Sequence, residues 1–136
     1  MDLKSLLVST KEMEVEFPNC PGFMVKLCYL DKESMRKIGE KSKIMGFDRK
    51  TRQPTEEMDE ELFTKLYIGK ALVGWKGLKL SYLKDLVLLD IEGEEDEEAL
   101  MAFTPENAID LVTASKDFDA WISSVISDVS LFNKRS

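Results

Sequence analysis

The sequence predicts an α+β fold in which an N-terminal β-hairpin precedes about four helices packed around one core. Three observations support this prediction: an alternating stretch near the N-terminus, a long helical pattern in the middle, and a regular amphipathic pattern near the end. A chain of 136 residues, 43% of them hydrophobic, is long enough for a single domain. We divide this domain, residues 1–136, into a hairpin region (1–30), a central helical region (31–91), an acidic loop (92–98) and a C-terminal helical region (99–133).

The hairpin is predicted from an alternation of apolar and acidic residues. Met13, Val15 and Phe17 alternate with glutamates, which is the period of a strand with one face in water. Turn-forming residues at 18–22 separate this strand from a second, mostly apolar stretch at 23–30. The chain has two cysteines, Cys20 and Cys28, which are too few for a disulfide framework, so we expect them to be reduced.

The first predicted helix follows the hairpin. Asp31 can cap its N-terminus by accepting a hydrogen bond from an early backbone N–H. Met35, Ile38 and Met45 would form a narrow apolar stripe under a charged exterior. Gly46 would then end the helix.

The second predicted helix is the central element of the fold. Thr55 stands at its N-cap position, acids follow at once, and lysines gather toward the other end, as the helix dipole favours. Two apolar rows that start at Met58 and Phe63 indicate a helix buried on two sides. Gly74 or Gly77 would end it, on either side of a tryptophan.

The rest of the chain is expected to alternate loops and helices. Residues 47–54 read as a basic loop, 78–91 fit either helix or strand, and six acids within 92–98 indicate a solvated loop. Residues 104–106, Thr-Pro-Glu, are a strong helix start. The last helix is predicted from apolar residues at i, i+3, i+4, i+7 spacing: Phe118, Trp121, Ile122, Val125, Ile126, Val129 and Phe132.

Composition narrows the classes of function. A net charge of −7 repels phosphate backbones and anionic lipid, so we expect no nucleic acid and no membrane partner. Apolar runs are too short for a bilayer span or a secretory signal, which favours the cytoplasm. The chain has no histidine, the commonest general base and metal ligand, and two cysteines fall short of a structural zinc site. We therefore expect no enzyme, no catalytic or cofactor-binding residue and no metal site.

Two patterns in the sequence suggest a bound ligand, but the spacing of their residues does not match a known binding motif. Gly69, Gly74 and Gly77 match neither the dinucleotide-binding nor the P-loop pattern, and they would close a helix instead of opening one. The acidic residues at 92–98 lack the alternating ligands and the distal glutamate of a calcium loop. A solvated loop is the favoured interpretation of that run.

Several short motifs follow one another between Tyr29 and Phe132. They are Phe47-Asp48-Arg49, Gln53-Pro54, Asp59, Phe63, Val73-Gly74-Trp75-Lys76-Gly77-Leu78, an acidic interval, and Phe103-Thr104-Pro105-Glu106-Asn107 ahead of the last amphipathic helix. In this order they resemble the tail assembly chaperones of long-tailed bacteriophages and prophages. The resemblance implies a non-enzymatic factor of the bacterial host cytoplasm. Its partners would be the tape measure protein, which such chaperones keep soluble, and the tail tube protein that polymerises around it; self-association of the chain is left open.

Four residues are candidates for protein interaction: Trp75, Lys76, Tyr67 and Tyr82. Tryptophan is enriched among interface hot spots, although Trp75 could instead be a core residue that closes the turn after the central helix. The alternative function is a structural minor tail protein or head-tail joining protein that stays in the virion. A small enzyme, or an acidic inhibitor that imitates nucleic acid, is a third hypothesis.

Overall fold

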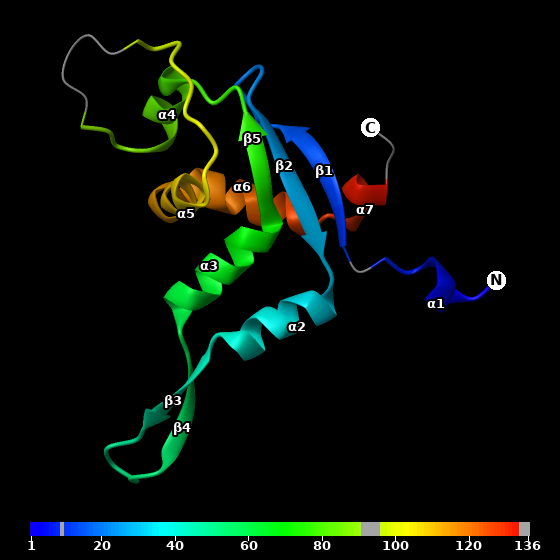
Figure 1. Ribbon diagram of the computed structural model, residues 1–136, viewed down its shortest axis with the longest axis vertical. Coiled ribbons are helices and arrows are strands. Elements are labelled where there is room, and N and C mark those ends of the chain that lie inside the picture. Colours follow the sequence, from blue (N-terminus) through cyan, green and yellow to red (C-terminus); the bar gives the residue numbers. More distant parts are fainter. Residues whose placement is uncertain (9, 91–95, 134–136) are drawn as a thin grey trace.

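The computed structural model describes residues 1–8, 10–90 and 96–133. Its helices and strands form the predicted α+β fold, with a three-stranded sheet, helices behind it and a separate two-stranded hairpin that projects from one end (Figure 1). Four of the described helices, α2, α3, α5 and α6, have ten or more residues. In chain order the elements are α1 (Leu3–Leu6), β1 (Thr10–Glu16), β2 (Met24–Leu30), α2 (Lys32–Lys41), β3 (Lys43–Phe47), β4 (Pro54–Met58), α3 (Glu60–Ala71), β5 (Leu72–Lys76), α4 (Leu80–Leu86), α5 (Pro105–Ala114), α6 (Lys116–Ser127) and α7 (Val129–Asn133).

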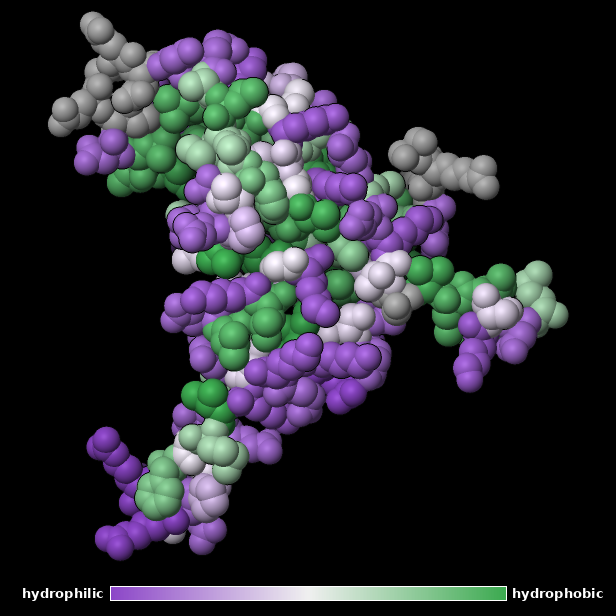
Figure 2. Space-filling model, in the orientation of Figure 1, coloured by the Kyte–Doolittle hydropathy of each residue, from purple (hydrophilic) through white to green (hydrophobic). Residues whose placement is uncertain are grey.

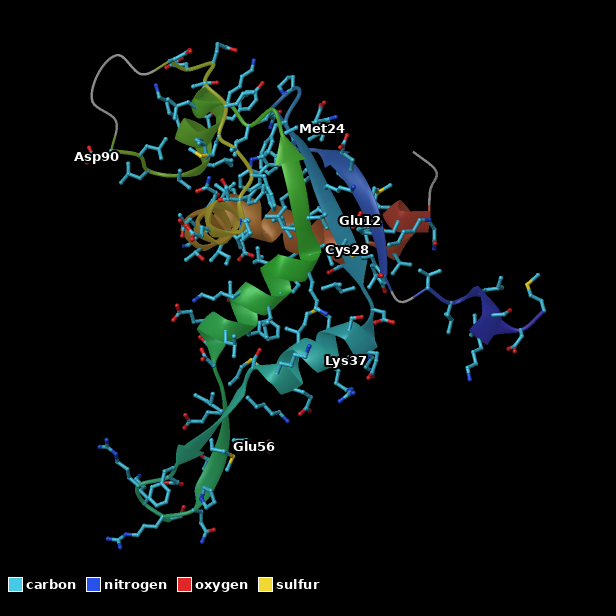
Figure 3. The ribbon with its side chains drawn as sticks, in the orientation of Figure 1. Glu12, Met24, Cys28, Lys37, Glu56 and Asp90 are labelled. Carbon is cyan, nitrogen blue, oxygen red and sulfur yellow. The ribbon has the colours of Figure 1, made fainter. Side chains whose placement is uncertain are left out.

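The three-stranded sheet is antiparallel and has the strand order β1-β2-β5. Strands β1 and β2 are the predicted hairpin, in a register that places Val15 opposite Val25. Because side chains alternate along a strand, the glutamates of β1 share the outer face with Lys26, and the valines point toward α6. Figure 3 shows Glu12, Met24 and Cys28 on this sheet. Both cysteines are free, and Cys20 is buried.

One cluster of buried apolar side chains joins the sheet to the helices. Phe23 of the β1–β2 connection and Phe118 of α6 are fully buried, and their rings stack with centroids 6.1 Å apart. The cluster extends from Phe17 to Phe132, so it draws on both ends of the described chain. Its aromatic centre lies between the sheet and α6.

The first helix begins where predicted but is shorter. The carboxylate of Asp31 accepts a hydrogen bond from the N–H of Ser34 at 2.8 Å, which is the expected N-cap. The helix then ends at Lys41, not at Gly46. The prediction that Met45 belongs to the apolar stripe of this helix is therefore wrong.

Residues 43–58 form an antiparallel hairpin, β3–β4, where a helix end and a basic loop were predicted. Thr55 lies in β4 and is not an N-cap; a loop remains only between Phe47 and Pro54, the paired ends of the two strands. Isoleucine, phenylalanine and threonine favour the extended backbone, and Arg52 adopts a positive φ of 57° in the turn. Local strand preference therefore outweighs the helical pattern here.

Helix α3 is shifted and less buried than predicted. Its N-cap is Asp59, whose carboxylate accepts a hydrogen bond from the N–H of Leu62 at 3.1 Å. The helix ends at Ala71, because the residues that follow pair with β2 as strand β5. Gly74 and Gly77 therefore do not end a helix. Within α3 only Ile68 and Ala71 are buried, so the prediction of burial on two sides is wrong.

The helices of the C-terminal region begin where the sequence predicts. The last predicted helix, however, contains a break that the sequence did not predict. Thr104 caps α5 and Pro105 is its first residue, as predicted. The ambiguous stretch 78–91 contains the helix α4. The last helix was predicted to run through Phe132 but is divided at Asp128, whose φ of −92° and ψ of 88° are not helical.

Parts of two predictions fall outside the described residues. Of the acidic loop, 92–95 are not described, and Glu97 and Glu98 form a turn. Of the polar tail, 134–136 are not described. No helix in the described ranges has the length and apolar character needed to cross a membrane.

Candidate protein-binding surface

Two of the four candidate residues are neighbours in β5 and point to opposite faces of the sheet. Lys76 lies on the outer face, where its ammonium is 3.4 Å from a carboxylate oxygen of Glu14 on β1. Trp75 faces the helices, half-buried, with its ring edge-on to that of Phe103 at a centroid distance of 4.9 Å. The two side chains therefore do not belong to one surface, as the alternation of a strand requires.

Tyr82 joins helix α4 to the turn between β1 and β2. Its hydroxyl donates a 2.6 Å hydrogen bond to the carbonyl oxygen of Pro21, in the turn between β1 and β2. The ammonium of Lys79 lies 5.6 Å from the centre of its ring, within the range of a cation–π contact. Tyr82 thus connects α4 to the sheet.

Trp75 also lines a small hollow of about 150 Å³, whereas Tyr67 lies in a larger groove between helices. This larger groove has a volume of about 540 Å³ and opens between α2, α3, α5 and α6. Tyr67 stacks on Phe63, one helical turn away, with ring planes 7° apart and centroids 6.2 Å apart. We call the larger groove the Tyr67 groove; it is lined by Met35, Phe63, Thr64, Tyr67, Ile68, Val112, Thr113, Asp119, Ser123 and Ser127.

The Tyr67 groove has an apolar floor and a polar rim. Ile68 and Val112 are buried below, and Phe63 and Tyr67 are half-buried, so part of each ring remains open to a partner. Burial raises the pKa of Tyr67, a hydrogen bond with Ser123 opposes that shift, and the charge of Asp119 adds to it. The phenol therefore stays protonated at neutral pH and can donate a hydrogen bond.

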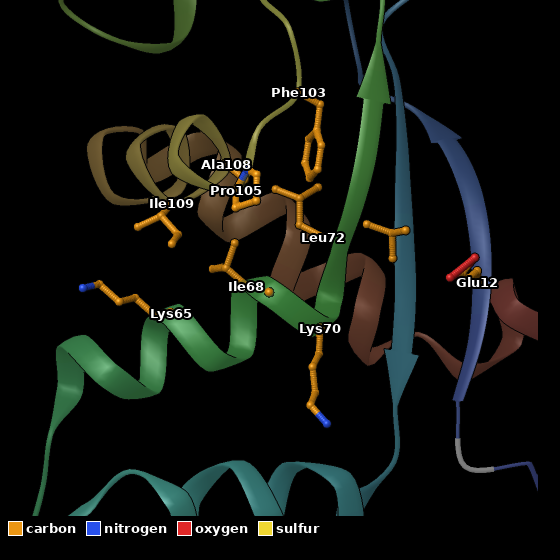
Figure 4. A pocket seen from close by; sticks show the side chains of 11 residues that line it. Glu12, Lys65, Ile68, Lys70, Leu72, Phe103, Pro105, Ala108 and Ile109 are labelled. Atoms are coloured by element: carbon orange, nitrogen blue, oxygen red, sulfur yellow. The ribbon is translucent and has the colours of Figure 1, made fainter.

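A second hollow lies on the other side of Ile68, between α3 and α5 (Figure 4). It has a volume of about 510 Å³, and Figure 4 shows Phe103, Pro105 and Ile109 along it. Lys65 and Lys70 of α3 and Glu12 of β1 also line it, so this hollow combines an apolar wall with charged side chains of both signs. Together the two hollows leave much of α3 accessible on both sides of its contact with α5.

The groove also contains residues that sequence analysis did not select. Met35 was assigned to the stripe of the first helix, and Phe63 to a buried row of the second. The i, i+4 pair of Phe63 and Tyr67 was a usable signal, but a sequence pattern does not tell a half-covered row from a buried one. Ser123 and Asp119 gave no signal, because exposed polar residues on a helix are the norm.

The described residues contain no group of three or more acidic or cysteine side chains placed to hold a metal ion. Comparison of the chain with protein-family models, with curated proteins and with solved structures gives no match. The geometry of the grooves, together with the motifs of the sequence, is thus the basis for a functional proposal.

Proposed function

We propose that this protein is a phage tail assembly chaperone that binds a helical segment of the tape measure protein in the Tyr67 groove. It acts by binding, without catalysis, and assists assembly of the tail tube. The phage assignment rests on the order of motifs from Phe47 to Asn107. The observation that supports a client site is the groove itself, with its half-buried methionine and stacked aromatic rings.

An amphipathic helix is the client that this groove suits. Such helices dock their apolar stripe into a hydrophobic groove between helices, and methionine and aromatic side chains adapt to stripes of different shape. Met35, Phe63 and Tyr67 supply these side chains from two helices. A long client offers many similar stripes, so an adaptable groove suits it better than a rigid pocket.

The rim of the groove adds polar contacts without strong charge. Ser123, Ser127 and Thr113 offer hydroxyl groups, and Asp119 is its one charged side chain. A basic residue at the edge of the client stripe would therefore be favoured over an acidic one, because Asp119 would attract it.

The proposal is tested by co-expressing the chain with the tape measure protein of the same phage or prophage. We expect the soluble yield of the tape measure protein to rise several-fold, and to fall back with Ser123→Arg, which places a long cation in the groove. Ser124→Arg is the matched control, since Ser124 is exposed on the same helix but does not line the groove. If the wild-type chain does not raise the soluble yield while both proteins are folded, the proposal is wrong.

Mass spectrometry of purified particles separates the chaperone from a structural tail protein. A chaperone leaves the finished tail, so its peptides should be absent from virions that contain the tube and tape measure proteins. Stoichiometric recovery of this chain in the particles would instead support a minor tail or head-tail joining protein.

A further inference from the structure

Strand β1 forms one edge of the three-stranded sheet, and β2 is its one partner among the described strands (Figure 1). The N–H of Phe17, directly after β1, donates a 2.9 Å hydrogen bond to the carbonyl oxygen of Phe23. Because backbone groups alternate along an antiparallel strand, the odd-numbered residues of β1 direct theirs toward β2, and the even-numbered ones, such as Glu14, direct theirs outward. Within the described ranges, β1 makes no backbone hydrogen bond except to β2. This edge therefore offers a row of donors and acceptors to an added strand.

The two faces of β1 differ in character along this edge. The side chains of Glu12, Glu14 and Glu16 are exposed on the outer face, and Figure 2 shows hydrophilic surface on this side of the sheet. Met13 and Val15 point inward and pack against the core, but they stay half-buried, since β1 ends the sheet. A further strand with apolar residues on its inner face would cover them.

The opposite edge strand, β5, is a poorer template for another strand. Its pairing with β2 shifts register between Lys26 and Leu27, and a bulge of this kind twists an edge away from a new partner. Beyond its end, Lys79 and Leu100 form an isolated antiparallel bridge, so the segment before α5 already occupies that side. The seven residues of β1, with their unbroken register, are therefore better suited to strand addition.

The glutamates of β1 determine which strand the edge accepts. Glu12 and Glu14 each lie 3.4 Å from one lysine of the sheet, yet their side chains are still about half exposed. Residues that face each other across two strands share a face of the sheet, so like charges there repel and opposite charges attract. The β1 strand of a second copy would place glutamates against glutamates. A strand with lysine or arginine at those positions is favoured instead.

We propose that the outer edge of β1 binds an extended segment of a partner protein in antiparallel orientation. This segment has lysine or arginine opposite Glu12, Glu14 and Glu16, and apolar residues opposite Met13 and Val15. The backbone hydrogen bonds give affinity, and the alternation of basic and apolar side chains gives specificity. No residue of β1 lines the Tyr67 groove, so the inference depends neither on the helical client nor on the phage assignment.

A synthetic peptide that alternates valine and lysine over the seven-residue length of β1 tests the proposal with the purified chain. Fluorescence anisotropy of the labelled peptide gives its Kd. The peptide residues opposite the glutamates direct their N–H groups toward the edge, so N-methylation of the lysines should weaken binding at least about tenfold. N-methylation of the valines, whose N–H groups point away, is the control of equal charge. If the lysine-methylated peptide binds at least as tightly as the valine-methylated one, the proposal is wrong.

Two substitutions in β1 separate the backbone from the charge. Glu14→Pro removes an outward N–H and leaves the bonds to β2, because an edge strand tolerates proline where the N–H faces away from the sheet. It should bind the peptide at least about tenfold more weakly than Glu14→Thr, which loses the same charge. Glu16→Lys should bind more weakly than Glu57→Lys, the same charge change at an exposed residue of β4. Circular dichroism establishes that each variant is folded, and equal affinities within either pair would contradict the proposal.

Hydrogen exchange followed by NMR locates the bound peptide. The N–H groups of Glu12 and Glu14 should become protected when the peptide binds, whereas those of Met13 and Val15, directed toward β2, should change little. Protection confined to another part of the chain would overturn the proposal. Protection of the Glu12 and Glu14 groups that rises with the concentration of the chain alone would overturn it too, since a second copy would then occupy the edge. None of these results affects the client-binding proposal, whose test uses Ser123→Arg.

Discussion

The indole N–H of Trp75 donates a 2.9 Å hydrogen bond to the carbonyl oxygen of Met101, 26 residues further along the chain. The N–H of Met101 in turn donates to the carbonyl oxygen of Leu78 at 2.8 Å. These two bonds hold the segment before α5 against the end of β5. Trp75 therefore fixes the connection between the sheet and the C-terminal helices.

Replacement of Trp75 by phenylalanine should lower the free energy of unfolding by about 1–2 kcal/mol, because a hydrogen bond and part of the ring contact are lost. Urea denaturation measures the change. Trp121→Phe is the control: Trp121 packs edge-on against Phe17, and its indole makes no hydrogen bond within the described residues. If Trp75→Phe is no less stable than Trp121→Phe, the hydrogen bond to Met101 does not contribute.

Two glycines should respond to alanine in opposite directions. Gly77 has a φ of 74°, and a Cβ there would overlap the carbonyl oxygen of Gly22. Gly77→Ala should therefore destabilise the fold by at least about 1–2 kcal/mol. Gly69 lies within α3 with open space around it, so Gly69→Ala should raise stability by up to about 1 kcal/mol. Thermal melts of both variants against wild type test this, and a loss of stability in Gly69→Ala would contradict it.

The sequence predicted elements well where local chemistry and tertiary packing agree. The β1–β2 hairpin has alternation, turn residues and a buried face, and α5 has a threonine cap followed by proline. In both cases the local signal and the packing point to the same structure. The fold class and the starts of these elements follow from such agreement.

The prediction failed where packing with a distant strand decided the structure. Residues 72–76 continue the helical pattern of α3, but pairing with β2 makes them a strand. The β3–β4 hairpin was missed because Ile44, Phe47 and Thr55 were assigned to a helix end, a loop and a cap, although each favours a strand. A periodic pattern alone does not reveal a partner strand that is far away in sequence.

The candidate site was only partly predictable for a related reason. Tyr67 was selected as an aromatic residue, yet its groove depends on how α2 and α6 are placed beside α3. Trp75 was selected because tryptophan is enriched among interface hot spots, yet its glycine neighbours mark a strand and its exit. Residue type identifies side chains suited to binding, but tertiary placement decides which of them share a surface.

The N-cap of α2 should make stability depend on pH. The hydrogen bond from the N–H of Ser34 holds the pKa of Asp31 below its ordinary value, with a smaller effect from Lys37. A lowered pKa in the folded state stabilises the fold above the ordinary aspartate pKa of about 3.9, and that contribution is lost as the pH falls through the folded pKa. Stability should therefore decline on acidification.

Asp31→Asn isolates this contribution, because asparagine caps a helix without titrating. Its urea midpoint should match wild type at pH 7 and fall less steeply between pH 5 and pH 3, a range set by that aspartate pKa of about 3.9. Asp31→Ala should be less stable at both ends of that range, since it lacks the cap. If the urea midpoint of Asp31→Asn falls as steeply with acidification as that of wild type, carboxylates other than Asp31 determine the pH dependence of stability.

The N-cap of α6 should matter more than that of α5 because it is buried. Ser115 is 1% exposed, and its hydroxyl oxygen accepts a hydrogen bond from the N–H of Phe118 at 3.2 Å. Ser115→Ala would leave that N–H without its acceptor in the core, at a cost of about 1–3 kcal/mol. Thr104→Ala removes an exposed cap whose N–H partner, on Asn107, water can satisfy, so it should cost less, about 0.5–1 kcal/mol. Urea denaturation of the two variants gives the comparison, and equal losses would mean that burial of the Ser115 cap adds nothing.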